Sequence, residues 1–422
     1  MPDIARLTAP VVRRRVFYIP GFDPAPPRRY RELYRREAQD QAALSGYALQ
    51  VDGRPGKGSF GWTVTARIDG VQTQSDIEIL VWSDIVRASM GGGILATYWQ
   101  LLRTAWVYIS SGTLFRLMRL RKGPVVAALY PIVVLLIELA LAGLTFWFVM
   151  PLAAMCLDWL RSAIYGPALF GPWFAMRMSV SVGTGLVAAL WLLRWFKAHD
   201  GHVFAYYLMH DYAFTARLRG AYPPALERRL DEFRGVIALA LQGECDEVLV
   251  VGHSSGAHLA VSVLADLLRQ SEPAVPLGFL SLGHVVPMVS FLPDAHRLRA
   301  DLQFLSTSEG LTWVDVTAPG DGCAFALCDP VAVTGVATPD KRWPLVVSAA
   351  FTQTLSPARW KALRWRFFRL HFQYLCAFDR PGDYDYFQIT AGPKTLAARY
   401  AGRTASKSRI ETATSAYTSR AA

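Results

Sequence analysis

The sequence predicts an α/β fold that is interrupted by a long apolar insertion. Short β-rich runs, such as 16–19 and 248–251, alternate with segments whose apolar residues recur at helical spacing, such as 225–242. Between residues 94 and 196 the pattern changes to nearly continuous apolar sequence. We therefore expect segments on both sides of this insertion to form one sheet with flanking helices.

Composition divides the chain into three parts. Residues 1–93 and 198–392 carry the α/β pattern and predict one discontinuous domain. Residues 94–197 make up the predicted insertion. Residues 393–422 are rich in Ala, Thr, Ser, Lys and Arg without apolar periodicity, so we expect them to be a disordered tail.

The α/β parts predict a regular succession of elements. Before the insertion we expect a strand at 16–19, a helix at 28–44 and strands at 62–68 and 77–82, with Asp69-Gly70 between the last two. After it we expect a helix at 225–242, a strand at 248–251, a helix at 257–269 and strands at 277–282 and 311–316.

The insertion predicts a transmembrane helical hairpin. The run 125–157 is almost wholly apolar and exceeds the roughly 20 residues that a span requires. We place the two spans at 125–149 and 178–196. Glu138 lies in the first, where we expect it to face the partner helix because exposure to lipid is costly. The preceding stretch, 94–118, suits either an interfacial helix or a cap helix packed on the α/β domain.

Basic residues flank the predicted spans. Lys and Arg number 44 against 33 Asp and Glu, a net charge of +11. Many of the basic residues stand beside apolar stretches, as at 116–122, which favours a membrane surface and argues against nucleic-acid binding. Because basic residues also end the second span at 194–197, the positive-inside rule places both outer flanks in the cytoplasm. We expect a multi-pass protein of the inner or cell membrane with a cytoplasmic α/β domain.

The strongest chemical motif is Gly-His-Ser-Ser-Gly at residues 252–256. Gly-x-Ser-x-Gly alone is a weak signal, but here it directly follows the strand 248–251 and precedes a helix that begins at Ala257. A strand, a sharp turn and a helix expose a serine hydroxyl above a sheet. We predict that Ser254 is a nucleophile. The alternative is an ordinary strand-to-helix turn with a serine N-cap.

From this motif onward the chain resembles the α/β-hydrolase superfamily, in its lipase and esterase branch. The resemblance implies a mostly parallel sheet and the catalytic order serine, acid, histidine. It implies His371 as the base, since no other histidine follows the strand 311–316. Asp321, in the turn after that strand, is the first candidate for the acid. Asp315 within the strand is the main alternative.

The resemblance also implies an oxyanion hole made of backbone N–H groups. Ser255, the residue after the nucleophile, is expected to supply one donor. The loop 19–23 (Ile-Pro-Gly-Phe-Asp) resembles the loop that supplies the other, although it has Pro20 where lipases often have His. We take Phe22 as the second donor, with Gly21 as the alternative. A simple Pro-Gly turn is the non-catalytic interpretation.

These features imply a membrane-anchored serine hydrolase that cleaves carboxylic esters, lipids among them, through an acyl-enzyme on Ser254. Thioester hydrolysis and acyl transfer by the same triad stay open, as does a homo-oligomer. A catalytically silent membrane scaffold with this fold is one alternative. A soluble enzyme with a hydrophobic cap is another. No nucleotide, metal or flavin motif stands out, so we expect no cofactor.

Overall fold

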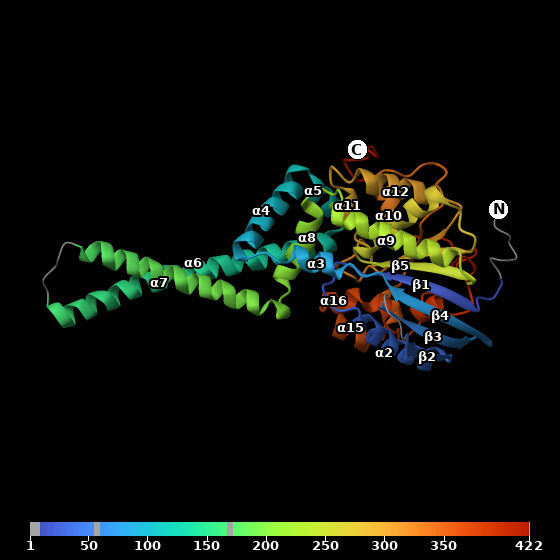
Figure 1. Ribbon diagram of the computed structural model, residues 1–422, viewed down its shortest axis with the longest axis horizontal. Coiled ribbons are helices and arrows are strands. Elements are labelled where there is room, and N and C mark those ends of the chain that lie inside the picture. The colour runs from blue at the N-terminus through green and yellow to red at the C-terminus, as the bar shows by residue number, and fades with distance from the viewer. Residues whose placement is uncertain (1–8, 55–59, 167–171, 422) are drawn as a thin grey trace. The chain divides into compact units, whose positions relative to one another are not determined.

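A computed structural model describes residues 9–54, 60–166 and 172–421 (Figure 1). The chain forms two compact units. The sheet unit comprises Met1–Ser89, Trp106–Val125 and Thr215–Ala422, and the helical unit comprises Met90–Ala105 and Val126–Phe214. Residues 106–125, which we expected in the insertion, belong to the sheet unit, and residues 198–214, which we expected in the α/β domain, belong to the helical unit.

One eight-stranded sheet organises the sheet unit, in the order β2-β3-β4-β1-β5-β6-β7-β8. β3 is antiparallel to both of its neighbours, and every other adjacent pair is parallel. The prediction of a mostly parallel sheet with flanking helices is therefore confirmed. The strands are β1 (Arg13–Ile19), β2 (Ala48–Gly53), β3 (Phe60–Ile68), β4 (Val71–Ile79), β5 (Glu247–His253), β6 (Leu277–Leu282), β7 (Thr312–Thr317) and β8 (Leu345–Ser348).

Helices cover both faces of this sheet (Figure 1). One face carries α9 (Pro224–Leu241), α10 (Gly256–Gln270) and α12 (His296–Thr307). The other carries α2 (Arg28–Ser45), α15 (Pro357–Leu363) and α16 (Phe367–His371). Shorter helices are α3 (Ser83–Ser89), α5 (Thr113–Leu120), α11 (Val286–Ser290), α13 (Pro330–Thr334), α14 (Phe351–Thr354), α17 (Tyr386–Ala391) and α18 (Leu396–Arg399).

The sequence does not predict the short strands β2 and β8 or the first residues of β4. β2 is an edge strand whose side chains are mostly exposed, so it lacks an apolar pattern. β8 has only four residues. β4 begins at Val71, six residues before the expected start, because its first inward positions are the small polar residues Thr73 and Ser75.

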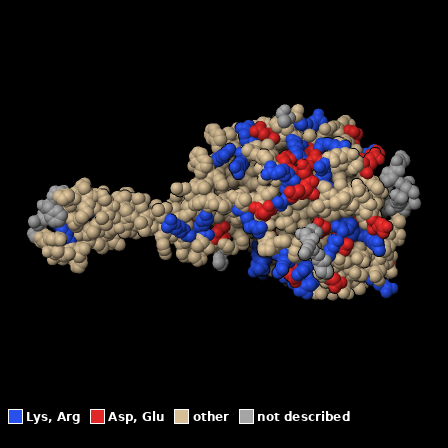
Figure 2. Space-filling view, in the orientation of Figure 1, with Lys and Arg blue, Asp and Glu red and all other residues tan. Residues whose placement is uncertain are grey.

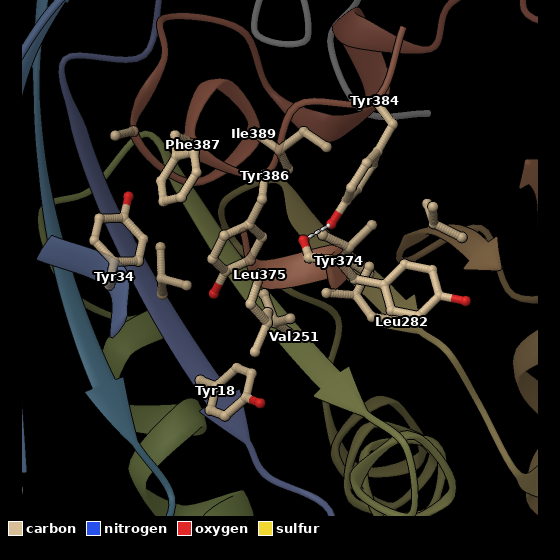
Figure 3. Packing of buried hydrophobic residues seen from close by; sticks show 14 of the residues in the cluster. Tyr18, Tyr34, Val251, Leu282, Tyr374, Leu375, Tyr384, Tyr386, Phe387 and Ile389 are labelled. Atoms are coloured by element: carbon tan, nitrogen blue, oxygen red, sulfur yellow. Dashed lines mark hydrogen bonds between the residues drawn. The ribbon is translucent and has the colours of Figure 1, made fainter. Parts of the chain in front are cut away.

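An aromatic cluster fixes the C-terminal segment to one face of the sheet (Figure 3). Tyr18 of β1 and Tyr34 of α2 are buried together with Tyr374, Tyr384 and Tyr386. The Tyr384 hydroxyl donates a hydrogen bond to the Tyr374 carbonyl at 2.6 Å. Burial of such large rings stabilises the position of the chain that follows α16.

The expectation of a disordered tail at 393–422 is wrong for the residues that the structure describes. Ile410 exchanges backbone hydrogen bonds with both sides of Cys328: its N–H donates to Leu327 and its carbonyl accepts from Asp329. Farther along, the Arg299 Nε donates to the Ser419 carbonyl at 2.6 Å. Main-chain hydrogen bonds of this kind leave no periodic side-chain pattern, which is why composition alone suggested disorder.

The helical unit is built mainly from α6 (Lys122–Tyr165) and α7 (Trp173–Ala198), with α8 (Ala205–Ala216) and most of α4 (Ile94–Ser110). α6 continues through Pro131 and Pro151, beyond the expected end of the first span at 149. Both α6 and α7 are long and apolar enough to cross a membrane. Their most apolar windows are only 28% and 17% buried, unlike the core helix of a soluble protein, and Figure 2 shows few charged atoms between their ends.

Glu138 is buried within the helical unit, as expected of an acidic residue in an apolar helix. Its polar neighbours include Tyr206 of α8 and Tyr98 of α4, and Tyr98 donates to the Leu135 carbonyl at 2.9 Å. The carboxyl group therefore lies beside α4 and α8, where we had expected the second helix of the hairpin. The sequence could not reveal this because both partners lie outside the two predicted spans.

The stretch 94–118, which we expected to form one helix, forms α4 and α5 with a break at Ser111-Gly112. Gly112 adopts a left-handed conformation with φ of 70°, which ends α4 and precedes α5.

Candidate active site

Ser254 lies between the end of β5 and the start of α10. Its φ is 58°, in the left-handed region that a residue with a side chain seldom adopts. Its N–H donates to the Leu282 carbonyl at 2.9 Å, and its own carbonyl accepts from Ala257 at 3.1 Å. Strained residues that are held this firmly cluster at functional sites.

The alternative of an ordinary N-cap does not describe this turn. Ser255 is the N-cap residue of α10, and its hydroxyl makes no capping hydrogen bond. Ser254 is half-buried, and its Oγ has no hydrogen-bond partner among the described residues.

The two glycines of the motif are required by close packing. A Cβ atom on Gly256 would lie 2.1 Å from the Ile19 carbonyl oxygen, at the end of β1. A Cβ atom on Gly252 would lie 2.8 Å from Ala257 Cα. Neither backbone neighbour can move without disturbing β1 or α10, so any side chain at these positions would open the turn.

This turn lies at the carboxyl ends of the two central strands, β1 and β5, which pair over six of their seven residues. From β1 the sheet extends through β4 on one side, and from β5 it extends through β6 on the other. In open α/β sheets, ligands bind in the crevice outside the carboxyl ends at such a point. The location of Ser254 is therefore one where a substrate can be bound.

The loop after β1 packs against Ser254. A Cβ atom on Gly21 would lie 3.0 Å from Ser254 Cβ and 3.4 Å from its Oγ. The Pro20 carbonyl accepts a hydrogen bond from Trp82 Nε1 at 2.9 Å, and the Phe22 ring contacts the Trp82 ring edge-on. The expected oxyanion loop is thus beside the expected nucleophile and is held by Trp82.

Ser255 and Phe22, the expected oxyanion donors, are both buried. The backbone N–H of Ser255 has no acceptor in the part of the chain that the structure describes. It stands at the N-terminus of the 15-residue helix α10, where the helix dipole favours a negative charge. This end of the turn is therefore suited to bind an oxyanion.

His371 and Asp321 form a hydrogen-bonded pair. His371 ends α16, and Asp321 lies in the turn that follows β7. His371 Nδ1 lies 2.7 Å from Asp321 Oδ2, and the two residues are only 6% and 2% exposed. An imidazole whose Nδ1–H is bonded to a carboxylate presents Nε2 as its proton acceptor.

The Asp321 carboxylate is stabilised in its charged form. Burial, the largest single influence, would raise its pKa, but the charge and hydrogen bond of His371 lower it. The Cys323 N–H, at 2.9 Å from Oδ1, and the Tyr374 hydroxyl, at 3.1 Å from Oδ2, act in the same direction. The net effect holds the pKa of Asp321 below its usual value, so the carboxylate stays ionised.

His371 lies next to the Ser254 turn. Its ring centroid is 4.8 Å from that of His253, and His253 Nε2 lies 3.0 Å from the His371 carbonyl oxygen. Burial, reinforced by the charge of His371, lowers the pKa of His253 to about 3. His253 is therefore neutral and can donate its Nε2–H to that carbonyl.

No hydrogen bond joins Ser254 Oγ directly to His371 among the described residues. Such bonds often tighten only when substrate is bound.

Asp315, the alternative acid, lies in a different hydrogen-bond network. It is fully buried in β7, accepts the Ser281 hydroxyl at 2.6 Å and lies 3.6 Å from His284 Nε2. Burial raises its pKa to about 6. Of the two aspartates, it is Asp321 that the structure brings to His371.

Asp321, Cys323 and His371 also form the kind of cluster that can bind a metal, with one donor atom from each within 4.8 Å of the others. Both carboxylate oxygens of Asp321, however, already accept hydrogen bonds. Burial and the charge of Asp321 raise the pKa of the Cys323 thiol, which disfavours the thiolate that binds metals. The geometry therefore fits a hydrogen-bonded acid–imidazole pair better than a metal centre.

Two residues of the site were not foreseen as functional. Tyr374 follows His371 by three positions, but its contacts with Asp321 and with the Ala318 N–H at 3.0 Å depend on tertiary structure. Trp82 reaches the Pro20 loop from the end of β4.

Comparison with protein-family models, with curated proteins and with solved structures gives no match for this chain.

Proposed function

We propose that this protein is a membrane-anchored serine hydrolase of the α/β-hydrolase type that cleaves carboxylic esters. The observation that carries the proposal is Ser254, at φ 58° between β5 and α10, beside the His371–Asp321 pair. The order serine, acid, histidine along the chain and the eight-stranded mostly parallel sheet support the same family.

The arrangement supports acyl transfer in two steps. His371 Nε2 accepts the proton of the Ser254 hydroxyl as Ser254 Oγ attacks the ester carbonyl. The Ser255 N–H and a donor of the loop at Gly21-Phe22 stabilise the oxyanion, and His371 then protonates the leaving alcohol. Water, activated by His371, hydrolyses the acyl-enzyme. Asp321 holds the imidazole in the required tautomer and stabilises its cation.

The apolar helices support membrane anchorage. α6 and α7 are apolar over lengths that match or exceed a bilayer, since 26 residues of helix extend about 39 Å at 1.5 Å per residue. Basic residues flank the outer ends of the hairpin, which favours a cytoplasmic sheet unit. A hydrolase held at a bilayer has esters of amphiphiles and lipids as its natural substrates.

Hydrolysis of a p-nitrophenyl ester by the detergent-solubilised full-length protein tests the proposal. Ser254→Ala should abolish turnover, while Ser255→Ala should retain it because Ser255 acts through its backbone. A folded wild-type protein without turnover would favour the catalytically silent scaffold. Transfer of the acyl group to a thiol or alcohol in preference to water would favour the acyltransferase.

A further inference from the structure

α4 carries an exposed apolar stripe along its whole length. Its members follow one another at spacings of four and three residues and are each between 49% and 84% exposed: Leu95, Trp99, Leu102, Trp106 and Ile109. At 100° per residue, these five positions lie within about 80° of the helix circumference. They therefore form one continuous outward face, which we call the α4 stripe.

The opposite face of α4 is packed. Thr97, Leu101, Thr104, Val107 and Tyr108 are buried. The Tyr108 hydroxyl donates to the Met288 carbonyl at 2.9 Å within the sheet unit, which fixes the end of α4 to the unit that contains Ser254. A surface helix of a water-soluble protein has polar residues on its outer face. The outer face of α4 carries the apolar α4 stripe instead, so it requires an apolar environment.

The charges around the α4 stripe indicate what that environment is. No acidic residue occurs between Asp84 and Glu138, whereas basic residues occur at Arg87, Arg103, Arg116, Arg119, Arg121 and Lys122. Arg103 is exposed and lies about 80° from Leu95, at the border of the stripe. Tryptophan and leucine bordered by arginine are typical of helices that lie in the plane of an anionic membrane interface.

The length of chain between α4 and α6 keeps the stripe close to the membrane that α6 is proposed to cross. Only residues 111–121 separate the two helices, and eight of these form α5. At 1.5 Å per helical residue and about 3.5 Å per extended residue, this linker reaches at most about 25 Å.

We propose that the α4 stripe inserts into the headgroup–acyl boundary of an anionic bilayer, parallel to its surface. Because Trp106 and Ile109 of the stripe belong to the sheet unit, this contact keeps the unit that contains Ser254 at the surface of the leaflet. It follows, resting on the proposed hydrolase function, that the substrates are esters of bilayer-resident amphiphiles that are taken from that leaflet.

Tryptophan quenching tests the insertion without reference to activity. The full-length protein would be reconstituted in nanodiscs of phosphatidylcholine and phosphatidylglycerol, with bromine on the acyl chains either near the headgroup or near the bilayer centre. The difference in fluorescence between wild type and Trp99→Phe/Trp106→Phe isolates these two residues. We expect this difference signal to be quenched more by the shallow bromine than by the deep one.

A matched pair of variants tests the consequence for substrate. Leu102 in the stripe and Leu239 on α9 are 61% and 71% exposed, so Leu102→Glu and Leu239→Glu perturb folding to a similar extent. On a water-soluble short-chain ester, both variants should match the wild type. On a long-chain ester embedded in anionic vesicles, Leu102→Glu should lose tenfold or more and Leu239→Glu should not.

The outcomes separate the two parts of the proposal. An unquenched difference signal would overturn the insertion, and a stripe-dependent dimer in detergent would assign the stripe to a second copy of the chain instead. Quenching as expected, combined with no esterase activity in any variant, would support the insertion and overturn the hydrolase function. Equal rates for Leu102→Glu and Leu239→Glu on vesicles, with quenching intact, would overturn the substrate inference.

Discussion

His371 and Asp321 meet at 2.7 Å between Nδ1 and Oδ2, although 50 residues separate them in the chain. This contact fixes the orientation of the imidazole beside the Ser254 turn. It also distinguishes the two aspartates on either side of the end of β7, since Asp315 is bonded to Ser281 instead.

Asp321→Asn should lower kcat on a soluble ester by roughly 10²- to 10⁴-fold with little change in KM, because the amide favours the wrong imidazole tautomer. Asp315→Asn is the matched control, with the same chemical change six residues away, and should stay within a few-fold of wild type. Steady-state kinetics of both variants decide the assignment, and the reverse order of effects would identify Asp315 as the acid.

Tyr374→Phe should lower kcat about tenfold, because the hydroxyl that it removes donates to the charged Asp321. Hydrogen bonds to charged groups contribute roughly 1.5–3 kcal/mol. Tyr384→Phe is the control, since its buried hydroxyl donates only to the Tyr374 carbonyl among the described residues. Both variants should lose thermal stability, but a loss of kcat in both would mean that Tyr374 acts only through stability.

Gly256→Ala should prevent the protein from accumulating in folded form, because the new Cβ would meet the Ile19 carbonyl at 2.1 Å. Gly235→Ala, on an exposed position of α9 with open space around it, should raise stability by roughly 0.5–1 kcal/mol. Expression and thermal denaturation of the two variants provide the measurement. Normal folding of Gly256→Ala would show that β1 and the turn are less tightly packed than described.

Asp315 should make stability depend on pH. Its folded pKa is raised to about 6 by burial, above its ordinary value near 3.8. Between these values the folded protein holds a proton that the unfolded chain releases, so the free energy of unfolding falls as pH rises toward 6. Asp315→Asn removes this dependence, which corresponds to a change of about 1–3 kcal/mol in the free energy of unfolding. The melting temperature of Asp315→Asn minus that of the wild type should therefore be larger at pH 7.5 than at pH 5. An unchanged difference would contradict a buried, protonated Asp315.

Leu141→Arg/Leu144→Arg should reduce the fraction of protein that resists alkaline extraction from membranes. Both leucines are exposed on α6, and arginine at mid-span costs roughly 2.5–3.5 kcal/mol on insertion scales. Leu239→Arg on α9 is the control and should remain in the membrane fraction. If wild type itself is extracted fully, α6 does not span a membrane.

The sequence reveals the elements of the site whose patterns are local. The apolar runs of β5 and β6, the helix α10 and the glycines of the 252–256 motif each have a short-range signal. The contact of Asp321 with His371 could be anticipated only through chain order, as a choice among aspartates. The Tyr374 and Trp82 hydrogen bonds could not be anticipated, because each joins segments that become neighbours only when the sheet forms.

Other parts of the fold lack a periodic signal for physical reasons. β2 is exposed at the edge of the sheet, and the segment after residue 393 is held by main-chain hydrogen bonds. The polar neighbours of Glu138 are tyrosines of α4 and α8, two helices that the sequence places outside the hairpin. In each case the deciding contact is tertiary.

Reaction with a fluorophosphonate is the most direct test of Ser254 as the nucleophile, because this reagent phosphonylates only a serine that is activated. The full-length protein would be treated in membranes, digested and mapped by mass spectrometry, alongside Ser254→Ala and Ser255→Ala. We predict one adduct on Ser254 in the wild type and in Ser255→Ala, and none in Ser254→Ala. A folded protein without an adduct, or with an adduct on another serine, would contradict Ser254 as the nucleophile.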